Sequence, residues 1–125
     1  MTSDLVKEIS CSQERTEKPW GFENLLEVNK HYALKEIFLR SGTRSSLQMH
    51  RRKHETIFVI SGRLELEIGK SVEALENCLF ASGAGYVVPP GYVHRVTALE
   101  DVRLVEVSTP ELDDIVRLRD DYGRS

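Results

Sequence analysis

Short apolar runs separated by turn-forming residues fill most of this chain from about residue 31 onward. Residues 63–68 read RLELEI, and alternation of this kind predicts a strand with one buried face. Residues 56–60 and 86–88 are apolar runs bounded by Gly, Ser or Pro, and residues 94–99 and 102–107 supply two further strands. Several short strands with turn signals between them predict an all-β sandwich or barrel.

The two ends of the chain follow no such pattern. Residues 1–16 are polar without a sustained period, and we predict an N-terminal arm that is either a short helix or irregular. Residues 17–125 are expected to form one barrel domain with a C-terminal tail. Within that tail, Thr109 followed by Pro110 is a helix-start signal, while the charges beyond it leave an extended chain equally open.

Composition limits the classes of function. A chain of 125 residues is the size of one domain, and its net charge of −3 argues against a nucleic-acid partner held by phosphate neutralisation. Its apolar runs are all much shorter than a membrane span, and the first residues lack the apolar core of a secretory signal. Cys11 and Cys78 fall in no metal-like spacing. We therefore predict a cytoplasmic protein with no membrane partner.

Two sequence blocks carry the candidate chemistry. In the block of residues 42–62, GTRSSLQMHRRKHETIFVISG, Gln48 and His50 are two apart and so share one face of a strand. Glu55 opens the next strand, and His94 ends the second block, GAGYVVPPGYVH. Two imidazoles, a carboxylate and an amide oxygen suit a divalent ion such as zinc, iron, nickel, manganese or cobalt.

Strand parity agrees with this metal hypothesis. Counted by twos along their strands, Glu55 and His94 each share a face with apolar residues, which predicts that both point into the barrel. Lys35 also falls on an apolar face by the same count. Because a lysine on an interior face is costly unless it is paired, Lys35 is a candidate pocket residue. His54 has the opposite parity to Glu55 and is expected to point outward.

The spacing of these blocks resembles the cupin superfamily. The first cupin motif is matched in order by Gly42, Gln48, His50, Glu55 and Gly62, with Gln48 in place of the usual leading histidine. The second is matched by Gly83, Pro89, Gly91 and His94, with Ala98 where an asparagine is usual. The resemblance implies a single-domain cupin, that is, a double-stranded β-helix or jelly-roll barrel, and a homodimer, as cupins commonly form.

Within the cupins, the chain resembles the C-terminal isomerase domain of type II phosphomannose isomerases. The similarity includes the Gln-x-His pair, residues 18–21 (KPWG) and a tail that reads DDIVR and DDYGR. It implies a metal-dependent mannose-6-phosphate isomerase with a phosphorylated sugar as substrate, and zinc first among the candidate metals. Arg51, Arg52 and Thr56 depart from the histidines of that family, so the pocket mouth is expected to be more cationic. The nucleotidyltransferase domain usually fused upstream is not in this sequence, so sugar-nucleotide synthesis is not inferred.

Residue roles follow from this resemblance and the chemistry. Aldose–ketose isomerisation needs a general base within hydrogen-bond reach, and we choose Glu106, although its parity in residues 102–107 is ambiguous. Lys35 and Arg44 complete the predicted catalytic set. Arg117 and Arg124 are predicted to bind substrate, because a sugar phosphate requires cations. The run Arg51–Lys53 is open between a solvated loop and a phosphate-reading role.

Two other functions remain open from the sequence. His50, Glu55 and His94 alone form the two-histidine, one-carboxylate set of non-haem iron oxygenases, so a dioxygenase-type cupin is one alternative. Gln48 as a fourth ligand would leave fewer positions for O₂ and substrate together. The other alternative is a sugar-binding cupin without turnover, because the fold by itself does not specify function.

Overall fold

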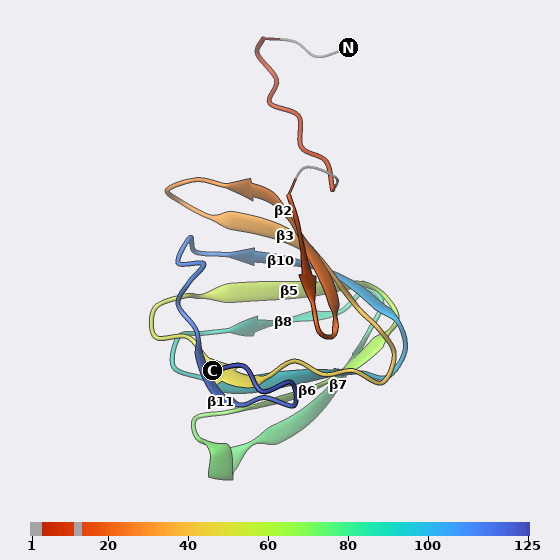
Figure 1. Ribbon diagram of the computed structural model, residues 1–125, viewed down its shortest axis with the longest axis vertical. Helices are drawn as coiled ribbons and strands as arrows, with labels where there is room; N and C mark the ends of the chain where they lie inside the picture. The colour runs from red at the N-terminus through yellow and green to blue at the C-terminus, as the bar shows by residue number, and fades with distance from the viewer. Residues whose placement is uncertain (1–3, 12–13) are drawn as a thin grey trace.

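The computed structural model describes residues 4–11 and 14–125, whose strands form two antiparallel sheets facing each other around one core (Figure 1). The first sheet has the order β1 (Arg15–Lys18), β2 (Gly21–Val28), β3 (Ala33–Leu39), β10 (Val102–Ser108), β5 (Glu55–Ser61) and β8 (Gly85–Val88). The second has the order β11 (Val116–Arg119), β4 (Leu47–Met49), β9 (Val93–Ala98), β6 (Arg63–Gly69) and β7 (Glu76–Ala81). The predicted all-β class is confirmed.

The strand patterns predicted from the sequence are visible in the burial of β5 and β6. Along β5, odd-numbered positions from Glu55 to Val59 are buried and the intervening ones are exposed. Gly62 joins the two strands with φ of +86°, a conformation that L side chains rarely adopt. A Cβ there would lie 2.1 Å from the Asp101 carbonyl oxygen, so the position requires glycine.

The interior between the sheets has an apolar part and a polar part. Val59, Leu64, Val88 and Val102 are each no more than 1% exposed in the apolar part, and burial of one such side chain stabilises the fold by about 1.5–3 kcal/mol. Along β10 the inward positions change from apolar to charged at Glu106, which is 8% exposed and lies opposite Lys35 of β3. The candidate site therefore occupies one end of the barrel.

Neither terminal segment forms a helix in the described residues. Residues 4–11 run as an irregular arm away from the barrel beyond β2 (Figure 1), with Lys7 bound to Glu27 at 2.6 Å. The helix alternative at Thr109 is wrong, because residues 110–115 form turns that fold back against the loop after His50. The one helical segment among the described residues is a 3-10 turn, η1 (Val72–Ala74). Nothing in residues 4–11 and 14–125 is a helix long and apolar enough to cross a membrane.

Candidate functional site

Strands from both sheets bring three of the four predicted metal ligands together. His50 follows β4, Glu55 begins β5 and His94 lies in β9, directly opposite Gln48 of β4. His50, Glu55 and His94 are each no more than 5% exposed, and one ligand atom from each lies within 4.8 Å of the others. They line a cavity of about 180 Å³. These residues are far apart in the sequence, and the packing of one sheet on the other brings them together.

The Glu55 carboxylate lies between the two imidazoles. Its Oε1 atom is 3.2 Å from Nε2 of His94 and 3.6 Å from Nε2 of His50. The two imidazole ring centres are 5.1 Å apart, with an angle of 51° between the ring planes. The nitrogens and the carboxylate oxygen therefore converge on one small volume.

Backbone carbonyls set the tautomer of both histidines. His50 Nδ1 lies 2.6 Å from the Asp114 carbonyl oxygen, and His94 Nδ1 lies 3.0 Å from that of Tyr92. Because a carbonyl can only accept, each Nδ1 donates its hydrogen and each Nε2 presents a lone pair to the site. This is the arrangement that orients a histidine to bind a metal through Nε2.

The unsatisfied atoms of the site fit a cation. Among the described residues, both Nε2 atoms are buried without a hydrogen-bond donor or acceptor. A lone pair 3.2 Å from a carboxylate oxygen is repelled unless a proton or a cation lies between the two atoms. Two imidazoles and one carboxylate are a donor set for zinc, iron, manganese or related ions. His50, Glu55 and His94 would thus hold a divalent ion, and the donor set does not select which one.

Gln48 lines the same cavity but has a second contact. Its Oε1 atom accepts a hydrogen bond of 2.7 Å from the Ser46 hydroxyl. An amide oxygen carries two lone pairs, so this bond orients the side chain and leaves one lone pair for a further ligand. No feature of the sequence distinguishes Ser46 as a positioning residue.

A buried lysine forms ion pairs with both Glu55 and Glu106. From the sequence, this lysine could belong either to a solvated loop or to a phosphate-binding site. Lys53, 6% exposed, places Nζ 3.2 Å from Glu55 Oε2 and 3.3 Å from Glu106 Oε2. The solvated-loop alternative is therefore wrong for Lys53, although Arg51 and Arg52 are exposed. The Lys53 ammonium binds Oε2 of Glu55, so the other carboxylate oxygen, Oε1, faces the two imidazoles. Lys53 thus fixes the orientation of the Glu55 carboxylate.

The ionisation of this group follows from burial and mutual charge. Burial, followed by the charge of the Glu55 carboxylate, raises the pKa of Glu106 to about 7, against the opposing charges of Lys53 and Lys35. Burial would also raise the pKa of Glu55, but the Lys53 ammonium and hydrogen bonds from the two imidazoles, when a proton occupies Nε2 in place of a metal ion, lower it below its usual range. Burial would lower the pKa of Lys53, yet Glu106 and Glu55 outweigh that effect and raise it. Glu106 is the group in the cavity suited to exchange a proton near neutral pH.

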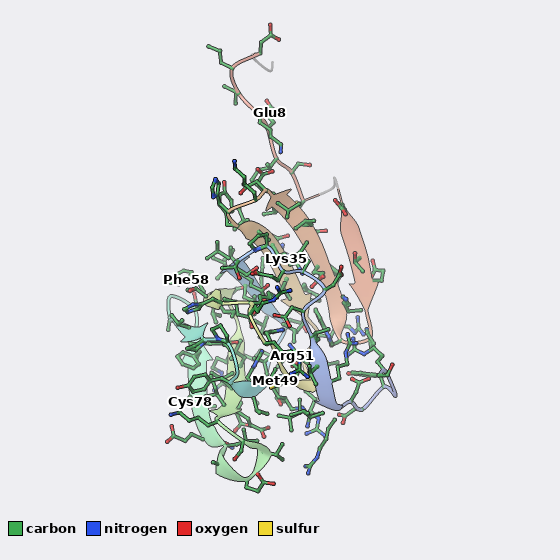
Figure 2. The ribbon with its side chains drawn as sticks, turned by 90° about the vertical axis from the view of Figure 1, so that its left-hand side faces the viewer. Glu8, Lys35, Met49, Arg51, Phe58 and Cys78 are labelled. Carbon is green, nitrogen blue, oxygen red and sulfur yellow. The ribbon has the colours of Figure 1, made fainter. Side chains whose placement is uncertain are left out.

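Lys35 also lines the cavity, on the strand face that parity indicated. Its Nζ lies 3.1 Å from Glu23 Oε1, and Lys18 Nζ lies 3.9 Å from the same oxygen. Two ammonium groups thus share one carboxylate, which leaves this wall with an excess of positive charge. Figure 2 shows Lys35 toward the middle of the molecule, whereas Phe58 lies at its periphery.

The three predicted arginines occupy different positions. Arg117 lines the cavity, donates to the Ser125 carbonyl oxygen at 2.9 Å, and has a buried Nε without a partner among the described residues. Arg124 lines it too, but its guanidinium binds both carboxylate oxygens of Asp120, at 2.9 and 3.1 Å. Arg44 is not among the residues that line the cavity, and it forms a bidentate ion pair with Asp121.

Asp114 is a second positioning residue that sequence reasoning missed. Its carboxylate accepts hydrogen bonds from the backbone N–H groups of residues 51–53, at 2.7 to 3.0 Å, while its carbonyl holds His50. These three N–H donors lower the pKa of Asp114 to about 2. A signal was present, since Asp113 and Asp114 belong to the tail that resembles the isomerase family, but nothing in the sequence pairs them with the loop.

Comparisons with known proteins place this chain in a family. The family described as Mannose-6-phosphate isomerase C-terminal matches residues 7–120. The xanthan biosynthesis protein XanB of Xanthomonas campestris pv. campestris is 31% identical over 113 residues, covering 86% of this chain and 23% of that protein. Mannose-1-phosphate guanylyltransferase 2 of Escherichia coli O157:H7 is 30% identical over 132 residues, covering 94% of this chain and 26% of that protein. The chain thus spans about a quarter of the length of these relatives.

Solved structures show the same fold at lower identity. KdgF from Halomonas sp. superposes with a TM-score of 0.75 at 17% identity, over 86% of this chain and 96% of that one. Oxalate decarboxylase of Bacillus subtilis, a protein with Mn(II) centres, gives 0.74 at 22% identity, over 86% of this chain and 30% of that one. These likenesses show the all-β cupin fold. With the family match over residues 7–120, they establish that this chain is a cupin of the mannose-6-phosphate isomerase C-terminal family.

Proposed function

We propose that this protein is a metal-dependent aldose–ketose isomerase that interconverts mannose 6-phosphate and fructose 6-phosphate. The observation that carries the proposal is the convergence of two unpartnered imidazole Nε2 atoms and the Glu55 carboxylate in one cavity with Glu106. The family match supports the substrate class. A divalent ion held by His50, Glu55 and His94, with Gln48 as a fourth ligand, would stabilise negative charge on the sugar oxygens.

The proton transfer is assigned to Glu106. Isomerisation moves a proton between C1 and C2 of the sugar, so one carboxylate can remove it from one carbon and return it to the other. A pKa of about 7 suits both steps at neutral pH. Lys53 holds Glu106 Oε2 at 3.3 Å and orients the carboxylate, so that Oε1 is the atom available to carry the proton.

The phosphate is assigned to the cationic wall of the cavity. Arg117 offers a buried Nε without a partner among the described residues, and Lys35 belongs to the wall with excess positive charge. Arg124 lines the same cavity and adds its positive charge there, while its guanidinium remains paired with Asp120. Arg44 is assigned to holding the tail, because its guanidinium is paired with Asp121 and it is not among the cavity-lining residues.

Proton exchange in D₂O tests this proposal. Metal-loaded protein is incubated with mannose 6-phosphate and other phosphosugars, and deuterium at C1 or C2 is followed by NMR. We expect incorporation that a chelator abolishes and that added metal restores. Oxygen consumption that requires iron would favour the dioxygenase alternative, and shifted sugar resonances without exchange would favour a binding protein. Either result would contradict the isomerase proposal.

A further inference from the structure

The cavity is lined by a further side chain that can donate and accept a proton, the phenol of Tyr86. Tyr86 of β8 lies directly opposite Ile57 of β5, and Ile57 lies opposite Glu106 of β10. Residues paired in this way across a sheet point to the same face, so the phenol and the proposed base share one wall of the cavity. Because adjacent strands are about 4.8 Å apart, the two residues are separated by roughly 10 Å. This separation leaves room for the C1–C2 unit of a sugar between the two side chains.

Within the part of the chain that the structure describes, the Tyr86 hydroxyl makes no hydrogen bond. Its ring is held in place by Phe80 of β7, with the two ring centres 5.0 Å apart. Burial, followed by the charges of Glu55 and Glu106, raises the pKa of Tyr86, so the phenol keeps its proton at neutral pH. The cavity therefore contains a neutral hydroxyl that is fixed in position and available to a ligand.

The other polar groups among the described cavity residues are engaged or can only donate. The Ser45 hydroxyl donates to the Ser46 carbonyl oxygen, and the Ser46 hydroxyl donates to Gln48 Oε1. Ammonium, guanidinium and indole groups donate hydrogen bonds but do not accept them. The two imidazoles and the carboxylate between them are assigned to the ion, and Glu106 is assigned to the carbon-bound proton. Because a neutral hydroxyl has one hydrogen and two lone pairs, Tyr86 can give a proton to one sugar oxygen and take a proton from another.

We propose that the Tyr86 hydroxyl carries the oxygen-bound proton between O1 and O2 of the sugar, as a further catalytic residue of the isomerisation proposed above, on which this role rests. Starting from the aldose, Glu106 takes the C2 proton, the C–H electron pair forms the C1–C2 double bond, and the carbonyl π pair moves to O1. Tyr86 gives its proton to O1 and takes the proton of O2. The electron pair on O2 then forms the ketone carbonyl, and the C1–C2 π pair takes the proton back from Glu106 at C1. Both side chains end in their starting states, so no co-reactant is needed.

Tyr86→Phe tests this role, because it keeps the ring against Phe80 and removes only the hydroxyl. Deuterium exchange at C2 of mannose 6-phosphate needs only Glu106, whereas formation of fructose 6-phosphate also needs the transfer between O1 and O2. In D₂O, with both followed by NMR, Tyr86→Phe should slow formation of fructose 6-phosphate by about 10²-fold and raise the ratio of exchange to conversion by about tenfold or more. A structural role would lower both rates alike. Tyr32→Phe is the matched control, since Tyr32 is 44% exposed and outside the cavity, and it should leave both rates unchanged.

A second measurement does not depend on turnover. In metal-loaded protein with ¹³C at the Cζ atoms of its tyrosines, the Tyr86 resonance is identified by its absence from Tyr86→Phe. If that variant does not fold, single replacements of the other tyrosines by phenylalanine assign the resonance by elimination. Added mannose 6-phosphate should shift the Tyr86 resonance and leave that of Tyr32 in place.

The outcomes separate the role of Tyr86 from the isomerase function. An active Tyr86→Phe with an unchanged ratio of exchange to conversion would overturn the role of Tyr86 and leave the isomerase function intact. A Tyr86 resonance that the sugar does not move would also overturn the role. A wild type that neither exchanges nor converts the sugar would overturn both. A raised ratio and a shifted Tyr86 resonance, with metal content and denaturation midpoint unchanged in Tyr86→Phe, would support the role.

Discussion

At one end of the barrel, β5 and β10 place charged side chains inside and apolar side chains outside, the reverse of the usual distribution. The inward face carries Glu55 and Glu106, which are 4% and 8% exposed, while the outward face carries Phe58 and Val107, which are about half exposed. Buried carboxylates are costly unless they are paired, and exposed apolar side chains contribute little to the stability of a monomer. The inward face therefore holds buried charge, as the proposed reaction site requires, while the outward face exposes apolar side chains.

Two ion pairs, one on each face, allow the inward and outward faces to be compared by distance and exposure. Lys53 and Glu106 lie 3.3 Å apart on the inward side, and Arg103 and Glu36 lie 3.1 Å apart on the outward side. The distances are similar, but the side chains of the first pair are 7% and 11% exposed, whereas those of the second are 46% and 21% exposed. The two pairs should therefore contribute differently to the free energy of unfolding because their exposure to water differs, since their N–O distances are nearly the same.

The largest expected effect comes from removal of a ligand on the inward face. His50→Ala should abolish metal binding and isomerase activity, because it removes one of three converging donors. Metal analysis after dialysis and the exchange assay in D₂O measure both. The matched control is His54→Ala, since His54 is exposed and lies outside the site, and it should keep full occupancy. Full metal occupancy in His50→Ala would contradict the assigned site.

Replacement of the proposed base should lower the rate without loss of the metal. Glu106→Gln is expected to reduce kcat by about 10²- to 10⁴-fold, the usual contribution of a general base. The wild-type rate should rise with pH through about 7, because Glu106 must be ionised to accept a proton, and this limb should vanish in the variant. Glu36→Gln on the outward face of the neighbouring strand is the control. An unchanged pH profile in Glu106→Gln would exclude Glu106 as the base.

Removal of the buried ammonium should destabilise the fold. Lys53→Met leaves Glu55 and Glu106 without their shared cation, and breaking a buried pair of this kind costs about 3–5 kcal/mol. Denaturant unfolding with and without metal measures the cost, which should be smaller when bound metal compensates the charge of Glu55. Arg52→Met, at an exposed position of the same loop, should have little effect. Equal stabilities of the two variants would show that the Lys53 contacts contribute nothing.

The smallest effect is expected on the outward face. Arg103→Ala breaks the exposed pair with Glu36 and should change the free energy of unfolding by about 1 kcal/mol or less. Increasing salt should reduce even this difference, since exposed pairs are screened. A loss as large as that of Lys53→Met would remove the contrast between the two faces.

Much of the site was predictable because regular spacing reports which face a side chain occupies. Gln48, His50, Glu55 and His94 followed from motif spacing and strand parity, and the structure brings His50, Glu55 and His94 within 4.8 Å of one another. Parity also placed Lys35 on the inward face. These inferences succeed because side chains alternate strictly along a strand, so a residue's face depends on local sequence alone.

Only the tertiary structure could assign the residues that lie outside a regular strand or depend on a distant partner. Lys53 lies in a loop, where no period applies, and its burial results from the approach of Glu106, a residue 53 positions later. Arg44 pairs with Asp121 of the tail and is not among the cavity-lining residues. Asp114 orients His50 through a backbone carbonyl, and every residue has one, so sequence could not single it out. The sequence by itself determined the ligand types and their strand faces, whereas packing of the tail and the two sheets decided which charges meet.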